Sequence, residues 1–179
     1  MKKNYILLTT AFILFALQSL SQLTAPFTET FSSSTTIPST WTTNTLPGGT
    51  GSAWRVGGSM GYGASTITNR NSGTPGTSRI WIDHSGSDNG IAITSDVINV
   101  SALGTPELKF YFNSNLGTYT VSPLNVVYVE AFDGTNWSRV DTIRQDNMGI
   151  WSEHFYNMSS YVYSSNLLQV RFVTYSGGS

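Results

Sequence analysis

The chain has 179 residues, a formal net charge of −1 and a charged fraction of 11%. A nearly neutral chain of this length fits one domain and excludes nucleic-acid binding by bulk positive charge. The hydrophobic fraction of 39% suffices for a packed core and excludes an intrinsically disordered chain. The absence of cysteine excludes disulfides, thiolate metal sites and a cysteine nucleophile.

Residues 1–21 have the pattern of a helical signal peptide. Two lysines form a positive start, and an apolar stretch of about 13 residues follows over Tyr5–Leu17. That stretch is shorter than the roughly 20 residues needed to span a bilayer. Small residues then predict cleavage between Ser21 and Gln22, which leaves residues 22–179 as the mature domain. We therefore expect a secreted or cell-surface protein with no transmembrane segment beyond the signal peptide.

After Ser21 the apolar residues follow the alternation of β-strands and show no helical period. Short segments rich in Val, Ile, Tyr and Phe are separated by Gly, Pro, Asn or Ser. Many short strands at this spacing are typical of a β-sandwich or barrel. The expected strands lie near Phe27–Phe31, Ala53–Gly57, Arg79–Asp83, Gly90–Thr94, Glu107–Ser114, Leu124–Phe132, Trp137–Arg144, Trp151–Met158 and Leu168–Tyr175.

Residues 133–136, Asp-Gly-Thr-Asn, predict the turn of a β-hairpin, because Asp-Gly supplies the left-handed backbone that a tight turn needs. With all four residues in the loop, an aromatic pair and an opposite-charge pair share one face, each contributing about 0.2–1 kcal/mol. A two-residue loop would instead oppose Glu130 with Trp137. The favoured register opposes Phe132 with Trp137, Glu130 with Arg139, Val129 with Val140 and Val127 with Thr142.

Two loops contain candidate ligand-binding tyrosines. The tract from Gly57 to Arg79 is rich in Gly, Ser, Thr and Asn, and loops of that length are uncommon in compact domains unless they bind something. It contains Tyr62, while Tyr161 and Tyr163 lie in a second Ser/Asn-rich segment. Aromatic rings with a polar edge suit sugar binding, so these three tyrosines are the predicted ligand contacts. The alternative is that the rings fill the core and the long loop is a surface excursion.

No catalytic motif stands out. The chain has neither a Gly-x-Ser-x-Gly elbow nor a His-Glu-x-x-His motif. His84 and His154 each follow an acidic residue directly, but neighbours in a strand point to opposite faces, so neither pair forms a catalytic dyad. The sequence does not exclude a pair of carboxylates for glycoside cleavage among Glu107, Glu130 and Glu153, because the distance between two carboxylates depends on the fold.

Several motifs follow one another along the mature chain: F-T-E-T-F at 27–31, I-P-S-T-W at 37–41, W-R-V at 54–56, D-H-S at 83–85 and F-D-G with a following Trp at 132–137. In this order they resemble the cleaved-adhesin and MAM families of extracellular modules of Bacteroidetes-type secreted proteins. The resemblance implies an antiparallel jelly-roll-like β-sandwich that mediates adhesion. The acidic last strand of the family, which should follow Gly177-Gly178, is missing here. We therefore expect the N-terminal part of a larger protein.

The resemblance also implies a structural cation. In the family it lies between the glutamate of the first strand and the acidic last strand, which makes Glu29 the matching ligand and Asp83 a second one. The segment Asp83–Gly90 is rich in oxygen ligands, which Ca²⁺ prefers, although it lacks the EF-hand pattern. For this segment itself a polar turn closed by Asp88-Asn89-Gly90 is the favoured interpretation, and a calcium loop is the alternative. Calcium is the expected ion.

Together these features predict an all-β, non-catalytic extracellular module that binds a carbohydrate or a protein. Its expected partners are a glycan or surface protein and further domains of the same chain, and no nucleic acid. Two other functions stay open. One is a secreted glycan-active hydrolase with a lectin-like jelly roll, and the other is a structural spacer.

Overall fold

A computed structural model describes residues 22–31, 36–51, 53–57, 79–82, 89–113, 126–144, 151–164 and 166–175. The strands within these ranges confirm the predicted all-β class. The predicted signal peptide and nearly all of the long Gly57–Arg79 loop lie outside them. The elements are β1 (Leu23–Thr24), β2 (Trp41–Thr50), β3 (Arg55–Val56), β4 (Ile80–Trp81), β5 (Asn89–Ser95), β6 (Ile98–Asn99), β7 (Glu107–Phe112), β8 (Val126–Phe132), β9 (Trp137–Arg144), β10 (Ser152–Asn157), the 3-10 helix η2 (Ser159–Tyr161) and β11 (Leu167–Tyr175).

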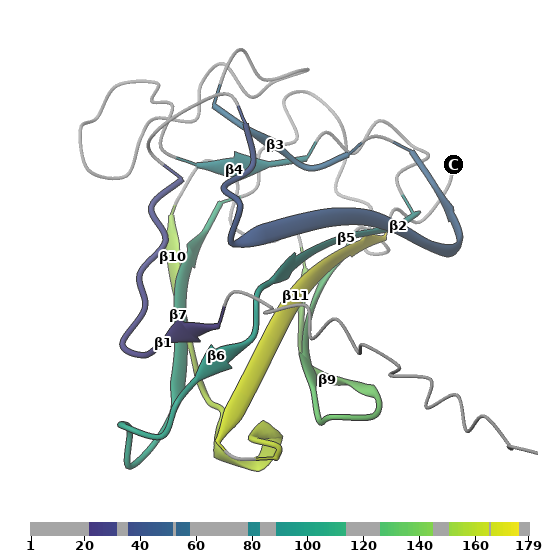
Figure 1. The fold of residues 1–179 in the computed structure, drawn as a ribbon. Coiled ribbons are helices and arrows are strands. Elements are labelled where there is room, and N and C mark those ends of the chain that lie inside the picture. Colours follow the sequence, from purple (N-terminus) through teal and green to yellow (C-terminus); the bar gives the residue numbers. More distant parts are fainter. Residues whose placement is uncertain are drawn as a thin grey trace, which may run out of the picture.

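The main sheet is built around β11. This strand lies between β5 and β8 and pairs antiparallel with both. β2 extends the sheet beyond β5, and β9 extends it beyond β8, which gives the order β2-β5-β11-β8-β9. The start of β11 also pairs with β6, and β6 pairs in parallel with β1. Figure 1 shows the strand direction turning steadily from β2 to β9, as expected of a twisted sheet.

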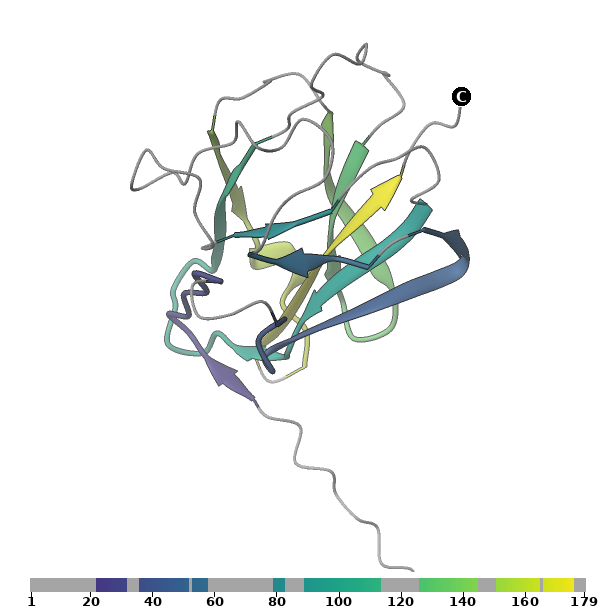
Figure 2. The ribbon, with the colours of Figure 1, turned by 90° about the horizontal axis from the view of Figure 1, so that it is seen from above.

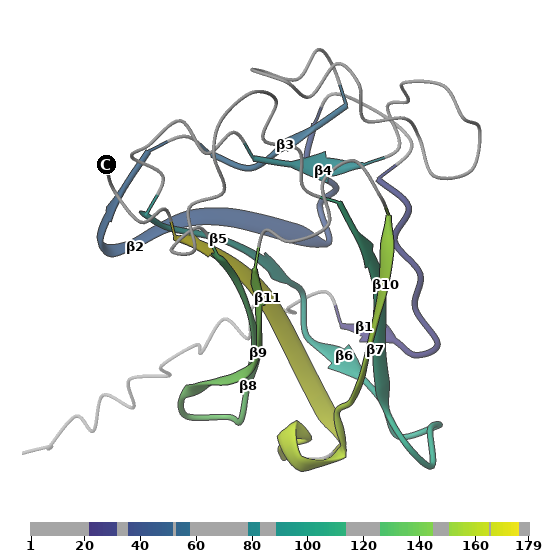
Figure 3. The same cartoon turned by 180° about the vertical axis from the view of Figure 1, so that it is seen from behind.

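A second, smaller layer faces the main sheet. It consists of β7 and β10, which pair antiparallel along their whole length. Figures 1 and 3 show this pair standing opposite β8, β9 and β11, and the view from above in Figure 2 separates the same two layers. The short antiparallel pair β3–β4 lies across one end of the layers. The arrangement is a β-sandwich with one large and one small sheet.

The core lies between these layers. Val129 and Ala131 of β8 are fully buried, and the ring of Phe110 on β7 meets the ring of Phe172 on β11 edge to face at 4.9 Å. Nearer β3, Ile91 and Ile93 of β5 are buried in one cluster with Trp54. Burying one large aliphatic side chain contributes about 1.5–3 kcal/mol, so period-two alternation on both layers drives their association.

One predicted strand is wrong, and three strands, β1, β2 and β6, were not predicted. Phe27–Phe31 forms no strand, because a side-chain oxygen of Glu29 accepts the backbone N–H of Phe31 at 2.8 Å and Phe31 takes a left-handed φ of 50°. The sequence of β2, Trp-Thr-Thr-Asn-Thr-Leu-Pro-Gly-Gly-Thr, has the composition of a loop but pairs with β5 through its backbone. The remaining predicted strands are present, with ends shifted by no more than two residues.

The β8–β9 hairpin confirms part of the predicted register. Phe132 opposes Trp137 and Glu130 opposes Arg139, and the Asp133 carboxylate accepts two backbone N–H groups in the turn. These two bonds, to Asn136 and Thr135, hold the pKa of Asp133 below its usual value. Gly134 has a φ of 94°, and an added Cβ there would meet the ring of Tyr163 at 3.1 Å, so only glycine fits without strain.

Beyond Glu130 the predicted register is wrong. Val129 opposes Asp141 instead of Val140, and Val127 opposes Ile143 instead of Thr142, because β9 contains one extra residue at this point. Val140 packs against the core clusters, and the next residue, Asp141, also turns its carboxylate toward β10. Regular alternation would direct the side chain of Asp141 outward. The bulge instead directs this acidic side chain into the interior.

Candidate functional site

The outer face of the main sheet contains a continuous row of aromatic and charged side chains. Antiparallel pairing of β8 with β9 and β11 places these side chains, apart from Tyr163, next to one another on the face that points away from β7–β10. We name this row the outer-face ladder. From one end to the other it consists of Tyr163, Phe132, Trp137, Arg171, Glu130, Arg139, Tyr128 and Tyr175.

Each member of the outer-face ladder contacts the next. The rings of Phe132 and Trp137 are 5.4 Å apart, and the guanidinium of Arg171 lies 4.2 Å above the indole of Trp137. At the other end, the guanidinium of Arg139 lies 3.2 Å from the ring centre of Tyr128. Such cation–π contacts contribute about 0.5–1 kcal/mol at exposed sites and more where water is excluded. The row is therefore a rigid surface before any ligand arrives.

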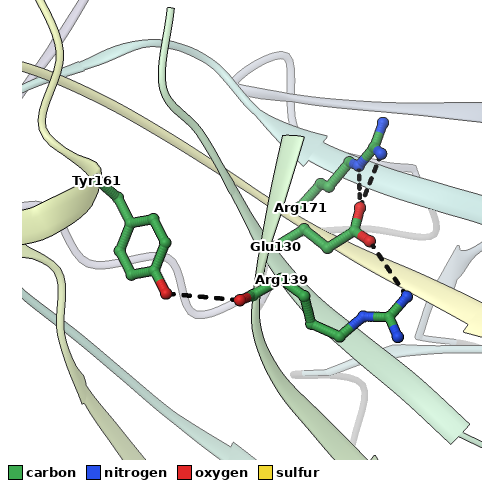
Figure 4. A network of polar contacts seen from close by, with 4 residues as sticks. All are labelled: Glu130, Arg139, Tyr161 and Arg171. Atoms are coloured by element: carbon green, nitrogen blue, oxygen red, sulfur yellow. Dashed lines mark hydrogen bonds and ion pairs between the residues drawn. The ribbon is translucent and has the colours of Figure 1, made fainter. Parts of the chain in front are cut away.

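The two arginines of the outer-face ladder differ in their charge balance. Arg171 donates from Nε and Nη2 to one oxygen of Glu130, both at 2.7 Å, and these side chains are only 14% and 12% exposed. Arg139 approaches the other oxygen of Glu130 at 3.8 Å and is 48% exposed (Figure 4). Because one carboxylate serves two guanidinium groups, the outer-face ladder has one net positive charge, and that charge is most accessible at Arg139.

One of the three predicted ligand-binding tyrosines, Tyr163, is at the end of the outer-face ladder. Tyr163 is half-buried, its ring contacts Phe132 edge-on at 5.5 Å, and burial raises its pKa. Tyr161 donates its hydroxyl to the carbonyl oxygen of Arg139 at 3.5 Å (Figure 4). Tyr62 lies outside the described residues. The structure therefore places Tyr163 at one end of the row, whereas Tyr161 packs against the core cluster of Ala131 and Met158.

The predicted calcium pair is not tested, because only one of its two ligands, Glu29, lies among the described residues. Both carboxylate oxygens of Glu29 are engaged, one by the N–H of Phe31 and the other by the hydroxyl of Thr40 at 3.4 Å. Asp83 lies outside the described residues. Within them, no three His, Cys, Asp or Glu side chains gather as a metal site would require. Calcium binding stays a prediction, and no function is derived from it.

A second polar cluster, which the sequence did not lead us to predict, lies between the two layers. The Oγ of Ser152 lies 3.1 Å from Nε2 of His154, and Nδ1 of the same imidazole lies 3.1 Å from the hydroxyl of Tyr156. Tyr156 donates to Oδ2 of Asp141 at 2.5 Å. We name these four residues the inner relay. Three of them recur every second residue along β10, which is a visible signal of one shared face.

The carboxylates named for glycoside cleavage are dispersed. Glu130 lies on the outer face of the main sheet, in the outer-face ladder. Glu153 is exposed on the other layer, where it contacts Lys109 at 2.6 Å and the hydroxyl of Tyr111. These two carboxylates belong to opposite outer surfaces of the sandwich, so they do not form a hydrolytic pair. The third, Glu107, opposes Asn157 at the other end of the β7–β10 pair from Glu153.

Tyr156 gives the inner relay a measurable pH dependence. Burial, and then the hydrogen bond and charge of Asp141, raise the pKa of Tyr156 well above its usual 10.0. Above pH 10 the unfolded chain therefore binds fewer protons than the folded one, and the free energy of unfolding falls with pH by up to about 1.4 kcal/mol per unit. Tyr156→Phe should remove this share of the slope in urea titrations between pH 9.5 and 11.5. A slope equal to that of the wild type would contradict the assignment.

The described residues form no helix with the length and apolar character of a membrane span. Comparisons of the chain with protein-family models, curated proteins and solved structures find no match. The resemblance to cleaved-adhesin and MAM modules therefore stays an expectation from the sequence.

Proposed function

We propose that this chain is an extracellular ligand-binding module of the adhesion type and that the outer-face ladder is its binding surface. The observation that carries the proposal is the row itself, eight side chains held in mutual contact on one face of a sheet. A surface whose rotamers are already fixed loses little conformational entropy on binding. Nothing in this function requires a covalent step.

The chemistry of the row favours an acidic glycan as the ligand. A guanidinium group already covers one face of the Trp137 ring and another covers one face of the Tyr128 ring. Stacking of a sugar on an uncovered ring face is therefore not the main interaction that this surface can make. What remains accessible is the fork of N–H donors on Arg139, which suits a carboxylate or sulfate. The tyrosine hydroxyls and ring edges beside it match the mixed polar and apolar surface of a sugar.

The N-terminal pattern supports an extracellular place for this activity. A positive start, a short apolar stretch and a small-residue cleavage site direct a chain to export. In that setting a glycan of a neighbouring surface is an accessible partner, and further domains of the same protein would anchor the module. A protein ligand and a spacer role without any ligand are the competing functions.

The binding proposal is tested with a charged ligand and its neutral counterpart. We expect calorimetry to detect binding of an oligogalacturonate, a uronic-acid oligosaccharide, and not of its methyl ester, which has the same backbone without the charge. Arg139→Ala should raise the dissociation constant about tenfold, because a hydrogen bond to a charged group contributes about 1.5 kcal/mol or more. Salt should weaken binding in the same way.

Lys109→Ala is the matched control. It removes an exposed cation from the outer surface of the other layer, and we expect the affinity to stay unchanged. Equal binding of the neutral ester, or an unchanged affinity in Arg139→Ala, would contradict the acidic ligand. Absence of binding to every glycan and protein surface screened would favour the spacer.

A further inference from the structure

The inner relay has an arrangement that stability alone does not require. Ser152 is the first residue of β10 and pairs with Phe112, the last residue of β7. β10 begins at the end of the sandwich where β3–β4 lies and runs toward η2 (Figures 1 and 3). The hydroxyl of Ser152 is thus outermost. The other groups of the inner relay follow inward, in the order His154, Tyr156 and Asp141. We infer that the inner relay activates Ser152 as a nucleophile that hydrolyses small acyl esters.

The hydrogen bonds of the inner relay fix where each proton lies. The carboxylate of Asp141 only accepts, and its two oxygens take the N–H of Thr142 and the hydroxyl of Tyr156. Since Tyr156 donates its proton to Asp141, its oxygen is left as the acceptor for His154, so Nδ1 must carry a proton. A neutral imidazole with Nδ1–H has a free lone pair on Nε2, and this lone pair accepts the hydroxyl proton of Ser152.

This direction of the hydrogen bonds, with Nδ1 as the donor and Nε2 as the acceptor, is the one that a serine nucleophile needs. In serine hydrolases a buried carboxylate fixes the tautomer of the imidazole, and the imidazole takes the proton of the serine. Here a tyrosine hydroxyl stands between His154 and Asp141 and transmits the same preference through one more hydrogen bond. Tyr156 and Asp141 are therefore positioning residues, whereas Ser152 and His154 meet the reacting atoms.

Packing holds the base in place. The imidazole of His154 stacks on the ring of Phe110 at 5.2 Å with an interplanar angle of 9°, and Phe112 contacts it edge-on at 6.0 Å. The hydroxyl of Ser152 also lies within donor distance of the carbonyl oxygen of Phe112 at 3.3 Å, which is a longer competitor for its proton than Nε2 at 3.1 Å. Two aromatic rings beside the base His154 favour an ester with a short apolar acyl group.

The proposed step is ordinary acyl transfer. Oγ of Ser152 forms a bond to the carbonyl carbon of the ester, and its proton moves to Nε2 of His154. The bond from that carbon to the alcohol oxygen breaks, and the alcohol leaves with the proton from Nε2. Water then attacks the acyl-serine with His154 as the base, which releases the carboxylic acid and restores the hydroxyl.

The proposal departs from the sequence expectation of a module without catalysis. For the histidines, that expectation considered only the acidic residue beside each one, and Glu153 does point to the outer surface, away from His154. The neighbours that matter stand two residues away, at Ser152 and Tyr156, and one stands on the opposite layer. The inference is independent of the ligand-binding proposal, because the inner relay and the outer-face ladder lie on opposite faces of the main sheet.

The first test compares two serines within the wild-type protein. A fluorophosphonate probe should label Ser152, with loss of fluoride, about 100-fold faster than the exposed Ser160, as determined by peptide mass spectrometry. The protein should also hydrolyse p-nitrophenyl acetate. Equal labelling of the two serines, no labelling of Ser152, or labelling without ester turnover would overturn the proposal, and none of these results needs a variant that folds.

The second test separates chemistry from structure. His154→Gln should slow the labelling of Ser152 about 100-fold or more, while Ser160→Ala should leave both labelling and ester turnover unchanged. For the positioning role, nitrogen-15 spectra should show the Nδ1–H tautomer of His154 in the wild type and its loss in Tyr156→Phe. Unchanged labelling in folded His154→Gln, or an Nε2–H tautomer in the wild type, would overturn the assignment.

Discussion

Replacing Arg171 by alanine is expected to lower the free energy of unfolding by about 3 kcal/mol. The carboxylate of Glu130 is only 12% exposed and loses its two short hydrogen bonds, while the one remaining guanidinium lies 3.8 Å away. Removing one partner of such a pair is costly because the other charge stays where water reaches it poorly. The indole of Trp137 also loses the group that covers its face. Urea unfolding at pH 7 measures the change.

Two comparisons distinguish this effect from a general loss of surface charge. Arg139→Ala removes a guanidinium that is 48% exposed, and we expect a loss below about 1 kcal/mol, as for other exposed ion pairs. The double variant Glu130→Met with Arg171→Met should be more stable than Arg171→Ala alone, because apolar side chains of similar size remove the unpaired charge. A change below about 0.5 kcal/mol in Arg171→Ala would contradict the buried pair.

Ile93→Ala is expected to lower the free energy of unfolding by about 4 kcal/mol. Ile93 lies in the middle of β5, is fully buried and opposes Phe172 of β11 and Thr43 of β2. Truncation removes three methyl or methylene groups and leaves a cavity between strands that pair on both sides and cannot collapse into it. A domain of this size has about 5–15 kcal/mol in total, so the melting temperature should fall sharply.

The matched control is Phe155→Ala. Phe155 is an aromatic residue of similar hydrophobicity, but it lies on the outer surface of β10 and is 55% exposed. We expect a change within about 0.5 kcal/mol, since exposed substitutions away from caps and buried pairs have small effects. Ile93→Val should lie between the two, near 1 kcal/mol, because it removes a single methylene. Equal losses in Ile93→Ala and Phe155→Ala would show that the core is placed wrongly.

The alternation of side chains was sufficient to predict the fold class and the strands with strong apolar faces. β5, β7, β8, β9 and β11 lie where it predicts strands, although a bulge interrupts it in β9, and the turn at Asp133-Gly134 fixed the near end of the β8–β9 hairpin. These features are local, since they depend on neighbours two residues apart or on one turn. The same reasoning failed where hydrogen bonds of the backbone determine the local structure. β2 has no apolar alternation but pairs with β5 through its backbone. Glu29 accepts the N–H of Phe31, and its segment therefore does not form a strand.

Both candidate sites needed the tertiary structure. The sequence shows that Glu130 can oppose Arg139, but its closer partner, Arg171, lies 41 residues away on β11 and becomes a neighbour only when β11 inserts beside β8. The inner relay needs the extra residue in β9, which turns Asp141 toward Tyr156. Period two determines which side chains of one strand share a face. Which strands pair, and where the register between two strands shifts by one residue, depends on the packing of the whole sandwich.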